Sequence, residues 1–253
     1  MGLAAISYDP VPMLAAFAAR RGIAFPLLSD AGSATITRFG ILNTTVPASN
    51  QLYGYPFPGT FIVNRESIVT SRFFEEAYQE RNTITSVLVR LGGRVDVSGT
   101  KTSAPHVDIT SFVTDRIAAP GTHFSLVLDV VPGKGVHVYA PDASGYRPIA
   151  LTVQRQANLV VRAAQFPKSE DYFFKPLKEH VPVFSKPFRL IQDLALDSSR
   201  AAEAALKDIT TMTIAASLEY QACDDKVCFS PQSVPLSWTI EVKPLDRERI
   251  PKQ

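Results

Sequence analysis

The chain has 253 residues, of which 45% are hydrophobic and 20% are charged, and its formal net charge is +2. These proportions are typical of a soluble globular protein, and the length allows one large domain or two ordinary ones. No basic run is longer than Arg20-Arg21, which argues against the basic stripe of a nucleic-acid-binding surface. The apolar runs are far shorter than the ~20 residues that span a bilayer. We therefore expect no nucleic-acid partner and no membrane span in this chain.

The first 92 residues alternate predicted strands with predicted helices. Asp9 and Pro10 form a helix-start signal, and Gly22 is a stop signal for the same helix. In chain order, we expect strands at 2–7 and 23–28, helices at 10–21 and 33–39, a hairpin at 61–63 and 68–73, and a helix at 81–91. This order predicts an α/β layer.

Four blocks in this region carry a family resemblance: Ala5-Ile6-Ser7-Tyr8-Asp9, Phe25-Pro26-Leu27-Leu28-Ser29-Asp30, Phe39-Gly40 and Pro58-Gly59-Thr60-Phe61-Ile62-Val63-Asn64-Arg65. They resemble the C-terminal half of a peroxiredoxin of the AhpC/TSA group, which implies a truncated thioredoxin-like segment over residues 1–92. The family's peroxidatic cysteine precedes the strand at 2–7, and this chain has no cysteine before Cys223. The resemblance also implies a cis peptide bond at Pro58, whereas X-Pro bonds in general favour trans.

The residue pattern of the sequence changes after a polar segment at 93–105, which is predicted to be a linker. Short segments rich in β-branched residues then recur with turn signals between them. Alternation is visible in Phe124, Leu126, Leu128 and Val130, and again between Leu236 and Val242. This pattern predicts an antiparallel β-sandwich of immunoglobulin type over 106–243, followed by a charged tail at 244–253.

Cys223 and Cys228 are the only cysteines, and four residues separate them between two predicted strands. A tight turn there brings the sulfurs within bonding range. Two solitary cysteines so placed favour a redox pair, and the alternative is a permanent staple between two strands. Asp224 and Asp225 disfavour a further negative charge, and Lys226 offsets them in part, so we expect no unusually acidic thiol.

A second resemblance rests on Tyr220-Gln221-Ala222-Cys223 with Cys228-Phe229-Ser230-Pro231, on His137-Val138-Tyr139-Ala140-Pro141 and on Val181-Pro182-Val183-Phe184. These blocks are similar to the N-terminal domain of the thiol:disulfide interchange reductase DsbD, an immunoglobulin-like module. The resemblance implies that Cys223 and Cys228 are catalytic, with Cys228 as the attacking residue. It also implies a set of near-site or capping residues: His137, Tyr139, Tyr172, Phe173, Phe174 and Tyr220. An alternative for the three adjacent aromatics is a hydrophobic plug under a long loop.

We therefore predict thiol:disulfide interchange with a thioredoxin-like or DsbD-type protein partner, without a cofactor and without a metal site. Two alternatives stay open. The first is a non-catalytic binding sandwich whose disulfide is structural, and the second is a fragment of a peroxiredoxin-type peroxidase whose catalytic cysteine lies upstream. No signal peptide is visible, although the DsbD-like module favours a periplasmic or other extracytoplasmic location.

Overall fold

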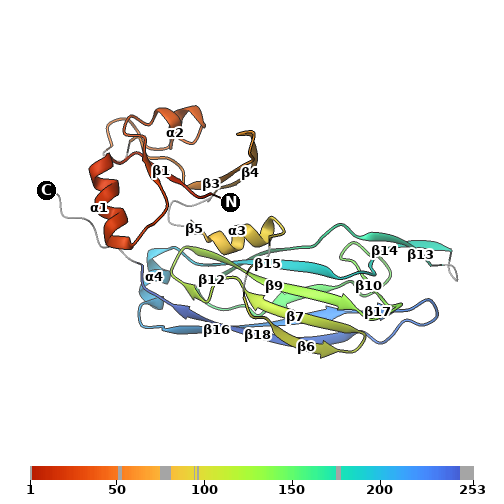
Figure 1. Cartoon of the computed structure of the whole chain (residues 1–253). Coiled ribbons are helices and arrows are strands. Elements are labelled where there is room, and N and C mark those ends of the chain that lie inside the picture. Colours follow the sequence, from red (N-terminus) through yellow and green to blue (C-terminus); the bar gives the residue numbers. More distant parts are fainter. Residues whose placement is uncertain are drawn as a thin grey trace. The chain divides into compact units, whose positions relative to one another are not determined.

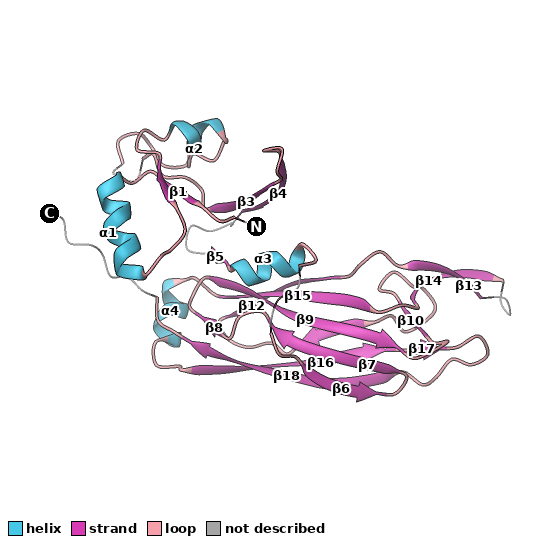
Figure 2. Ribbon diagram, in the orientation of Figure 1, coloured by secondary structure: helices cyan, strands magenta, loops and turns pink. Residues whose placement is uncertain are grey.

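The computed structural model describes residues 2–50, 53–74, 81–93, 95, 97–174 and 178–245. The chain divides into two compact units, of which the first ends at Tyr78 and the second runs from Gln79 to Leu245. Figure 1 labels their elements, and Figure 2 shows that strands dominate the second unit. None of the helices in the described residues is long and apolar enough to cross a membrane.

The first unit has the predicted order of strand, helix, strand, helix and hairpin. Its elements are β1 (Ala5–Ser7), α1 (Val11–Arg21), β2 (Leu27–Ser29), α2 (Ala34–Arg38), β3 (Gly59–Val63) and β4 (Val69–Phe74). Strand β1 lies parallel to β2, and β3 pairs with β4 in an antiparallel hairpin. Gly22 ends α1 in the left-handed conformation that a side chain disfavours, at φ 61°. These elements form the partial thioredoxin-like segment that the sequence predicts.

The structure corrects the expected start of α1 and shows the conformation of the peptide bond at Pro58. Pro10, and not Asp9, is the N-cap residue of α1, because the Asp9 carboxylate binds the hydroxyl of Ser7 instead. No peptide bond among the described residues is cis, so Pro58 follows the ordinary trans preference.

The second unit is a β-sandwich with a smaller third sheet. The larger sheet has the order β12-β15-β9-β7-β6, and the facing sheet has the order β11-β16-β18-β8. The strands of the larger sheet are β6 (Thr100–Ala104), β7 (Val107–Val113), β9 (Thr122–Pro132), β12 (Leu159–Gln165) and β15 (Phe188–Leu196). Those of the facing sheet are β8 (Ile117–Ala118), β11 (Ala150–Val153), β16 (Thr211–Tyr220) and β18 (Gln232–Val242). The third sheet, β13-β14-β10-β17, holds the cysteines.

Alternating side chains fill the space between the two main sheets. Phe124, Leu126 and Leu128 of β9 are fully buried, and Ile214 and Ile240 meet them from the other sheet. A strand directs successive side chains to opposite faces, so this period of two places every second residue in the core. The alternation expected from the sequence is therefore confirmed, and the fold is an immunoglobulin-like sandwich. Helix α4 (Arg200–Leu206) begins after β15 with Ser199 as its N-cap.

The expected domain division, with a first domain ending at 92 and a linker at 93–105, is wrong in two places. Helix α3 (Ile84–Arg90), expected in the first domain, belongs to the second unit, together with the short strand β5 (Arg81–Asn82), which lies parallel to β9. Val89 of α3 is buried against Phe112 and Val127, on the outer face of the larger sheet. Within the expected linker at 93–105, β6 pairs along its whole length with β7. Both segments are thus integral parts of the sandwich.

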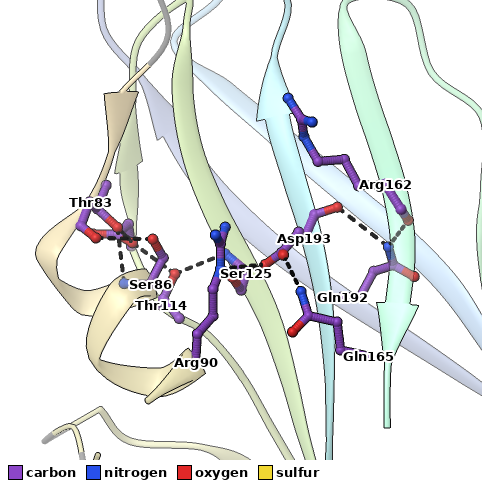
Figure 3. Close-up of polar contacts among 10 residues, drawn as sticks. Thr83, Ser86, Arg90, Thr114, Ser125, Arg162, Gln165, Gln192 and Asp193 are labelled. Carbon is purple, nitrogen blue, oxygen red and sulfur yellow. Dashed lines mark hydrogen bonds and ion pairs between the residues drawn. The ribbon is translucent and has the colours of Figure 1, made fainter. Parts of the chain in front are cut away.

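A buried carboxylate holds α3 on this face. Asp193 of β15 is 4% exposed, and its oxygens accept hydrogen bonds from Ser125 Oγ at 2.7 Å, Gln165 Nε2 at 2.7 Å and Arg90 Nε at 3.2 Å. Figure 3 shows these side chains converging from α3, β9 and β12. The buried Asp193 carboxylate is satisfied because three side chains donate hydrogen bonds to it. Removing this carboxylate would take the shared acceptor away from all three donors.

We expect Asp193→Ala to destabilise the second unit by about 3 kcal/mol or more, because one buried carboxylate is the shared acceptor of a cation and two polar side chains, and its removal breaks all three contacts at once. The matched control is Asp129→Ala. Asp129 also binds an arginine, Arg189, at 2.7 and 2.8 Å, but both side chains are about a third exposed, so the loss should stay below about 1 kcal/mol. Trp238, the single tryptophan, is buried in the sandwich and reports its unfolding by fluorescence during urea denaturation. Equal losses in the two variants would contradict this account.

Candidate functional site

The two cysteines are joined at the end of the third sheet. Its strands are β10 (His137–Tyr139), β13 (Glu170–Phe174), β14 (Glu179–Phe184) and β17 (Ala222–Cys223). Cys223 and Cys228 form an antiparallel bridge and a disulfide, with their α-carbons 4.1 Å apart. Asp224 shapes the turn between them, since its Oδ1 accepts hydrogen bonds from the backbone N–H groups of Lys226 and Val227, each at 2.7 Å. These two bonds lower the pKa of the Asp224 carboxyl.

The two cysteine residues differ sharply in their exposure to solvent. Cys223 is 1% exposed and packs in a small cluster with Tyr139, Val181 and Val183. Cys228 is exposed, and the neighbouring Val227 is also 55% exposed. A nucleophile arriving from solvent can therefore reach Cys228, whereas Cys223 is shielded.

One hydroxyl group contacts both sulfurs. Tyr139 Oη lies 3.1 Å from Cys223 Sγ and 3.3 Å from Cys228 Sγ. A disulfide sulfur carries no hydrogen, so only the hydroxyl can donate in these contacts. Tyr139 is 3% exposed, and burial raises the pKa of its hydroxyl, which therefore keeps its proton. The arrangement places a fixed donor where negative charge develops when the disulfide opens.

His137 lies beside Cys223 because the two residues are paired across β10 and β17. Its side chain is buried, and burial lowers the pKa of the imidazole although the Asp225 and Asp224 carboxylates act in the opposite direction. The ring is therefore neutral at pH 7. It packs against the ring of Tyr172, with centroids 4.4 Å apart.

The aromatic segment expected to be a capping loop is an edge strand. Tyr172, Phe173 and Phe174 belong to β13, which pairs with β14, and Lys175 at the end of the expected segment lies outside the described residues. Tyr172 packs on the cysteine cluster, and its hydroxyl donates to Asp225 Oδ1 at 2.6 Å, which raises the pKa of Tyr172 to about 12. Phe173 is 45% exposed, and its ring packs on that of His180. Alternation along a strand separates these neighbours onto different faces, and Phe174 is paired with Glu179.

Two further residues reach the site from positions that the sequence did not single out. The ring of Tyr146 stacks on that of Tyr139 with centroids 4.2 Å apart, and the Tyr146 hydroxyl donates to Glu179 Oε1. Tyr146 follows Gly145 in a loop without strand periodicity, so no local pattern points to it.

Tyr220, which was expected near the site, lies in the main core, and its hydroxyl donates to the carbonyl of Pro105 at 2.7 Å.

Two family models match the chain. Residues 110–236 match the N-terminal domain of the thiol:disulfide interchange protein DsbD, and residues 2–72 match the AhpC/TSA family. In a search among curated protein sequences, none matches the chain.

Solved structures resemble the chain only distantly. The reduced N-terminal domain of Neisseria meningitidis DsbD is 15% identical, with 46% of this chain and 81% of that chain covered and a TM-score of 0.31. The N-terminal periplasmic domain of ScsB from Proteus mirabilis is 13% identical, with coverages of 54% and 49% and a TM-score of 0.36. The GAE domain of GGA2p from Saccharomyces cerevisiae is 6% identical, with coverages of 55% and 96% and a TM-score of 0.33. Similarity at this level adds nothing to the argument from the site.

The DsbD match covers half of the chain and includes both cysteines, Tyr139 and the strands that carry them. The AhpC/TSA match covers the thioredoxin-like segment of the first unit. The site therefore has a function related to thiol–disulfide chemistry, and the chain belongs to the family of DsbD N-terminal domains, with an AhpC/TSA-type segment preceding that module.

Proposed function

We propose that this chain exchanges its Cys223–Cys228 disulfide with the dithiol of a thioredoxin-like or DsbD-type protein partner. The observation that carries the proposal is the unequal exposure of the two cysteine residues, whose sulfurs contact one shared hydroxyl donor. Exchange requires one sulfur that a partner can attack and a second that leaves and later returns. Cys228 and Cys223 meet these two requirements, in that order.

In the reductive direction, a thiolate of the partner attacks Cys228 Sγ. A bond forms between the partner sulfur and Cys228 while the Cys223–Cys228 bond breaks, and the electron pair leaves on Cys223 as a thiolate. Tyr139 Oη, 3.1 Å from Cys223 Sγ, donates a hydrogen bond to this new charge. A donor aimed in advance at the atom that gains charge stabilises the transition state without reorganisation.

The second step completes the transfer. Another thiolate of the partner attacks the partner's own sulfur in the mixed disulfide, and Cys228 leaves as a thiolate. The partner's dithiol has then become a disulfide, and this chain has gained two electrons and two protons. Each step is reversible, so the same residues carry the opposite reaction when Cys228 attacks a disulfide of the partner.

The alternative of a structural staple gains little support from the energetics. A bond that closes a loop with a sequence separation of 5 stabilises a fold by roughly 2 kcal/mol in the chain-entropy description, at the low end for disulfides. The flanking strands β16 and β18 are already paired over their length, from Thr211–Glu241 to Tyr220–Gln232. The turn also has its own hydrogen bonds from Asp224. The disulfide is thus nearly redundant for holding this hairpin.

The peroxidase alternative places its catalytic cysteine outside these 253 residues. The AhpC/TSA-like residues 2–72 contain no cysteine, and Cys223 and Cys228 are the only two in the chain. Thiol chemistry carried out by these 253 residues therefore uses the sandwich.

Single substitutions should separate the roles of the two sulfurs. We expect reduced Cys223→Ser to form a stable mixed disulfide with a thioredoxin that keeps one cysteine, activated as a thionitrobenzoate disulfide, because no second thiol displaces the partner. Cys228→Ser should form this complex at a rate about tenfold lower or more, because the partner must reach the sulfur that attacks it. Non-reducing electrophoresis measures the complex, and the double variant is the blank. Equal trapping by both variants, or a wild-type disulfide with a potential below about −300 mV that resists the partner's dithiol, would contradict the proposal.

Removal of the shared hydroxyl should slow the exchange. We expect Tyr139→Phe to lower the rate at which dithiothreitol opens the disulfide by about tenfold to a hundredfold, because a hydrogen bond to a charged group contributes about 1.5–3 kcal/mol. The matched control is Tyr220→Phe, which also removes a buried hydroxyl and its hydrogen bond, but in the main core. The control should lower stability by about 1 kcal/mol and leave the rate unchanged. An unchanged rate in Tyr139→Phe would refute the role given to this hydroxyl.

A further inference from the structure

The residue that follows Cys228 is held from several sides. The backbone N–H of Phe229 donates to the carbonyl of Ala222 at 2.9 Å, and Gln221 Nε2 donates to the carbonyl of Phe229 at 3.1 Å. The Phe229 ring packs on the main core of the sandwich, and the ring of His106 stacks on it with centroids 3.6 Å apart. None of these contacts uses a sulfur atom, so none of them requires a closed disulfide.

His106 presents its ring from a backbone conformation that residues with a side chain seldom adopt. It lies in the turn between β6 and β7 with φ at 67°, in the left-handed region. Its carbonyl accepts a hydrogen bond from the backbone N–H of Gly133 at 2.9 Å, and Ala104 pairs with Val107 across the turn. Glycine would adopt this conformation at no steric cost, whereas histidine keeps some strain and supplies the ring that covers Phe229.

We propose that His106 is a positioning residue for thiol–disulfide exchange: its ring holds Phe229 in place and thereby keeps Cys228 next to Cys223 while the disulfide is open. This role rests on the exchange proposed above and adds to it a residue that controls how readily the pair closes again. His106 acts through Phe229, the neighbour of Cys228, and not on a sulfur atom itself.

The rest of the segment between the cysteines is already fixed. Cys223 lies in the third sheet, and the turn after it is closed because the backbone N–H of Asp224 donates to the carbonyl of Val227 at 3.0 Å. The position of Cys228 after reduction therefore depends on the arm that begins at Phe229. Two thiols held close together react as if at high concentration, because the entropy of bringing them together has already been lost. Loss of the stack on Phe229 loosens this arm and lowers that effective concentration.

The equilibrium with glutathione measures the effective concentration directly. The thiols of Cys223 and Cys228 lose two electrons and two protons and form one disulfide. One molecule of glutathione disulfide accepts the same electrons and protons and becomes two glutathione thiols. A segment that is already in place in the reduced protein favours the closed disulfide, whereas a loosened segment favours the dithiol.

Three variants test the contribution of the ring. His106→Gly removes it and leaves a residue that accepts the left-handed backbone, and His106→Phe keeps a ring that can stack on Phe229. The matched control is Asn158→Gly, in the loop before β12 of the larger sheet. Asn158 also has a positive φ, of 63°, and its carbonyl also accepts a backbone N–H, from Asp197 at 2.9 Å. Each full-length protein is equilibrated in glutathione buffers of stepped ratio, the thiols are trapped by alkylation, and mass spectrometry gives the oxidised fraction.

We expect the effective concentration to fall about three- to tenfold in His106→Gly, the contribution of an aromatic pair, which raises the reduction potential by about 15–30 mV. His106→Phe should recover most of the wild-type value, and Asn158→Gly should keep it. Phe229→Leu should also raise the potential, and adding His106→Gly to it should change the potential no further, because the two rings act as a pair. A general loss of stability would not distinguish His106→Gly from Asn158→Gly in this way.

The outcomes that contradict this role differ from those that contradict the exchange. If the wild type equilibrates with glutathione and His106→Gly has the same potential, the exchange stands and His106 does not position the pair. A shift of equal size in Asn158→Gly leads to the same conclusion. If the wild-type cysteines do not equilibrate with glutathione at any ratio, the exchange itself fails and the role of His106 fails with it.

Discussion

The pairing of His137 with Cys223 across β10 and β17 is the constraint on which the site depends. It fixes the backbone of Cys223 in a sheet, and alternation along β10 then brings Tyr139, two residues further, to the same face. From this position one hydroxyl contacts both sulfurs. The unequal exposure of the cysteines follows from the same pairing, because Cys223 lies in the sheet and Cys228 lies at the end of the turn that leaves it.

The sandwich holds this site without including it in its main core. Cys223 packs in a separate small cluster, while the main cluster joins the two large sheets. Function on a rigid scaffold commonly uses elements at its ends, because these can contact a partner while the core stays packed. The energetic argument against a structural staple has the same origin, since β16 and β18 are paired along their length whether or not the disulfide is closed.

The sequence was sufficient for the sandwich and for the cysteine pair, because periodicity along strands and a local motif are both short-range signals. It failed at the boundary between the units. Thr100–Ala104 is polar and small, like a linker, but it forms an edge strand that pairs along its whole length with β7. Composition also cannot show that Val89 of α3 packs on the sandwich. Tyr146 and Glu179 were missed because 33 residues separate them and only the fold joins their side chains.

The acidic turn does not set the chemistry of the pair as directly as its sequence indicates. Asp224 and Asp225 flank Cys223, and two free carboxylates there would oppose a thiolate. In the folded chain, Asp224 is bound by two backbone N–H groups and Asp225 by the Tyr172 hydroxyl. Each carboxylate is thus engaged by donors of its own. The contact that acts on the sulfur atoms themselves is the one with Tyr139. If the exchange proposed above takes place, the hydroxyl 3.1 Å from Cys223 Sγ is therefore the group best placed to influence how readily Cys223 leaves and returns.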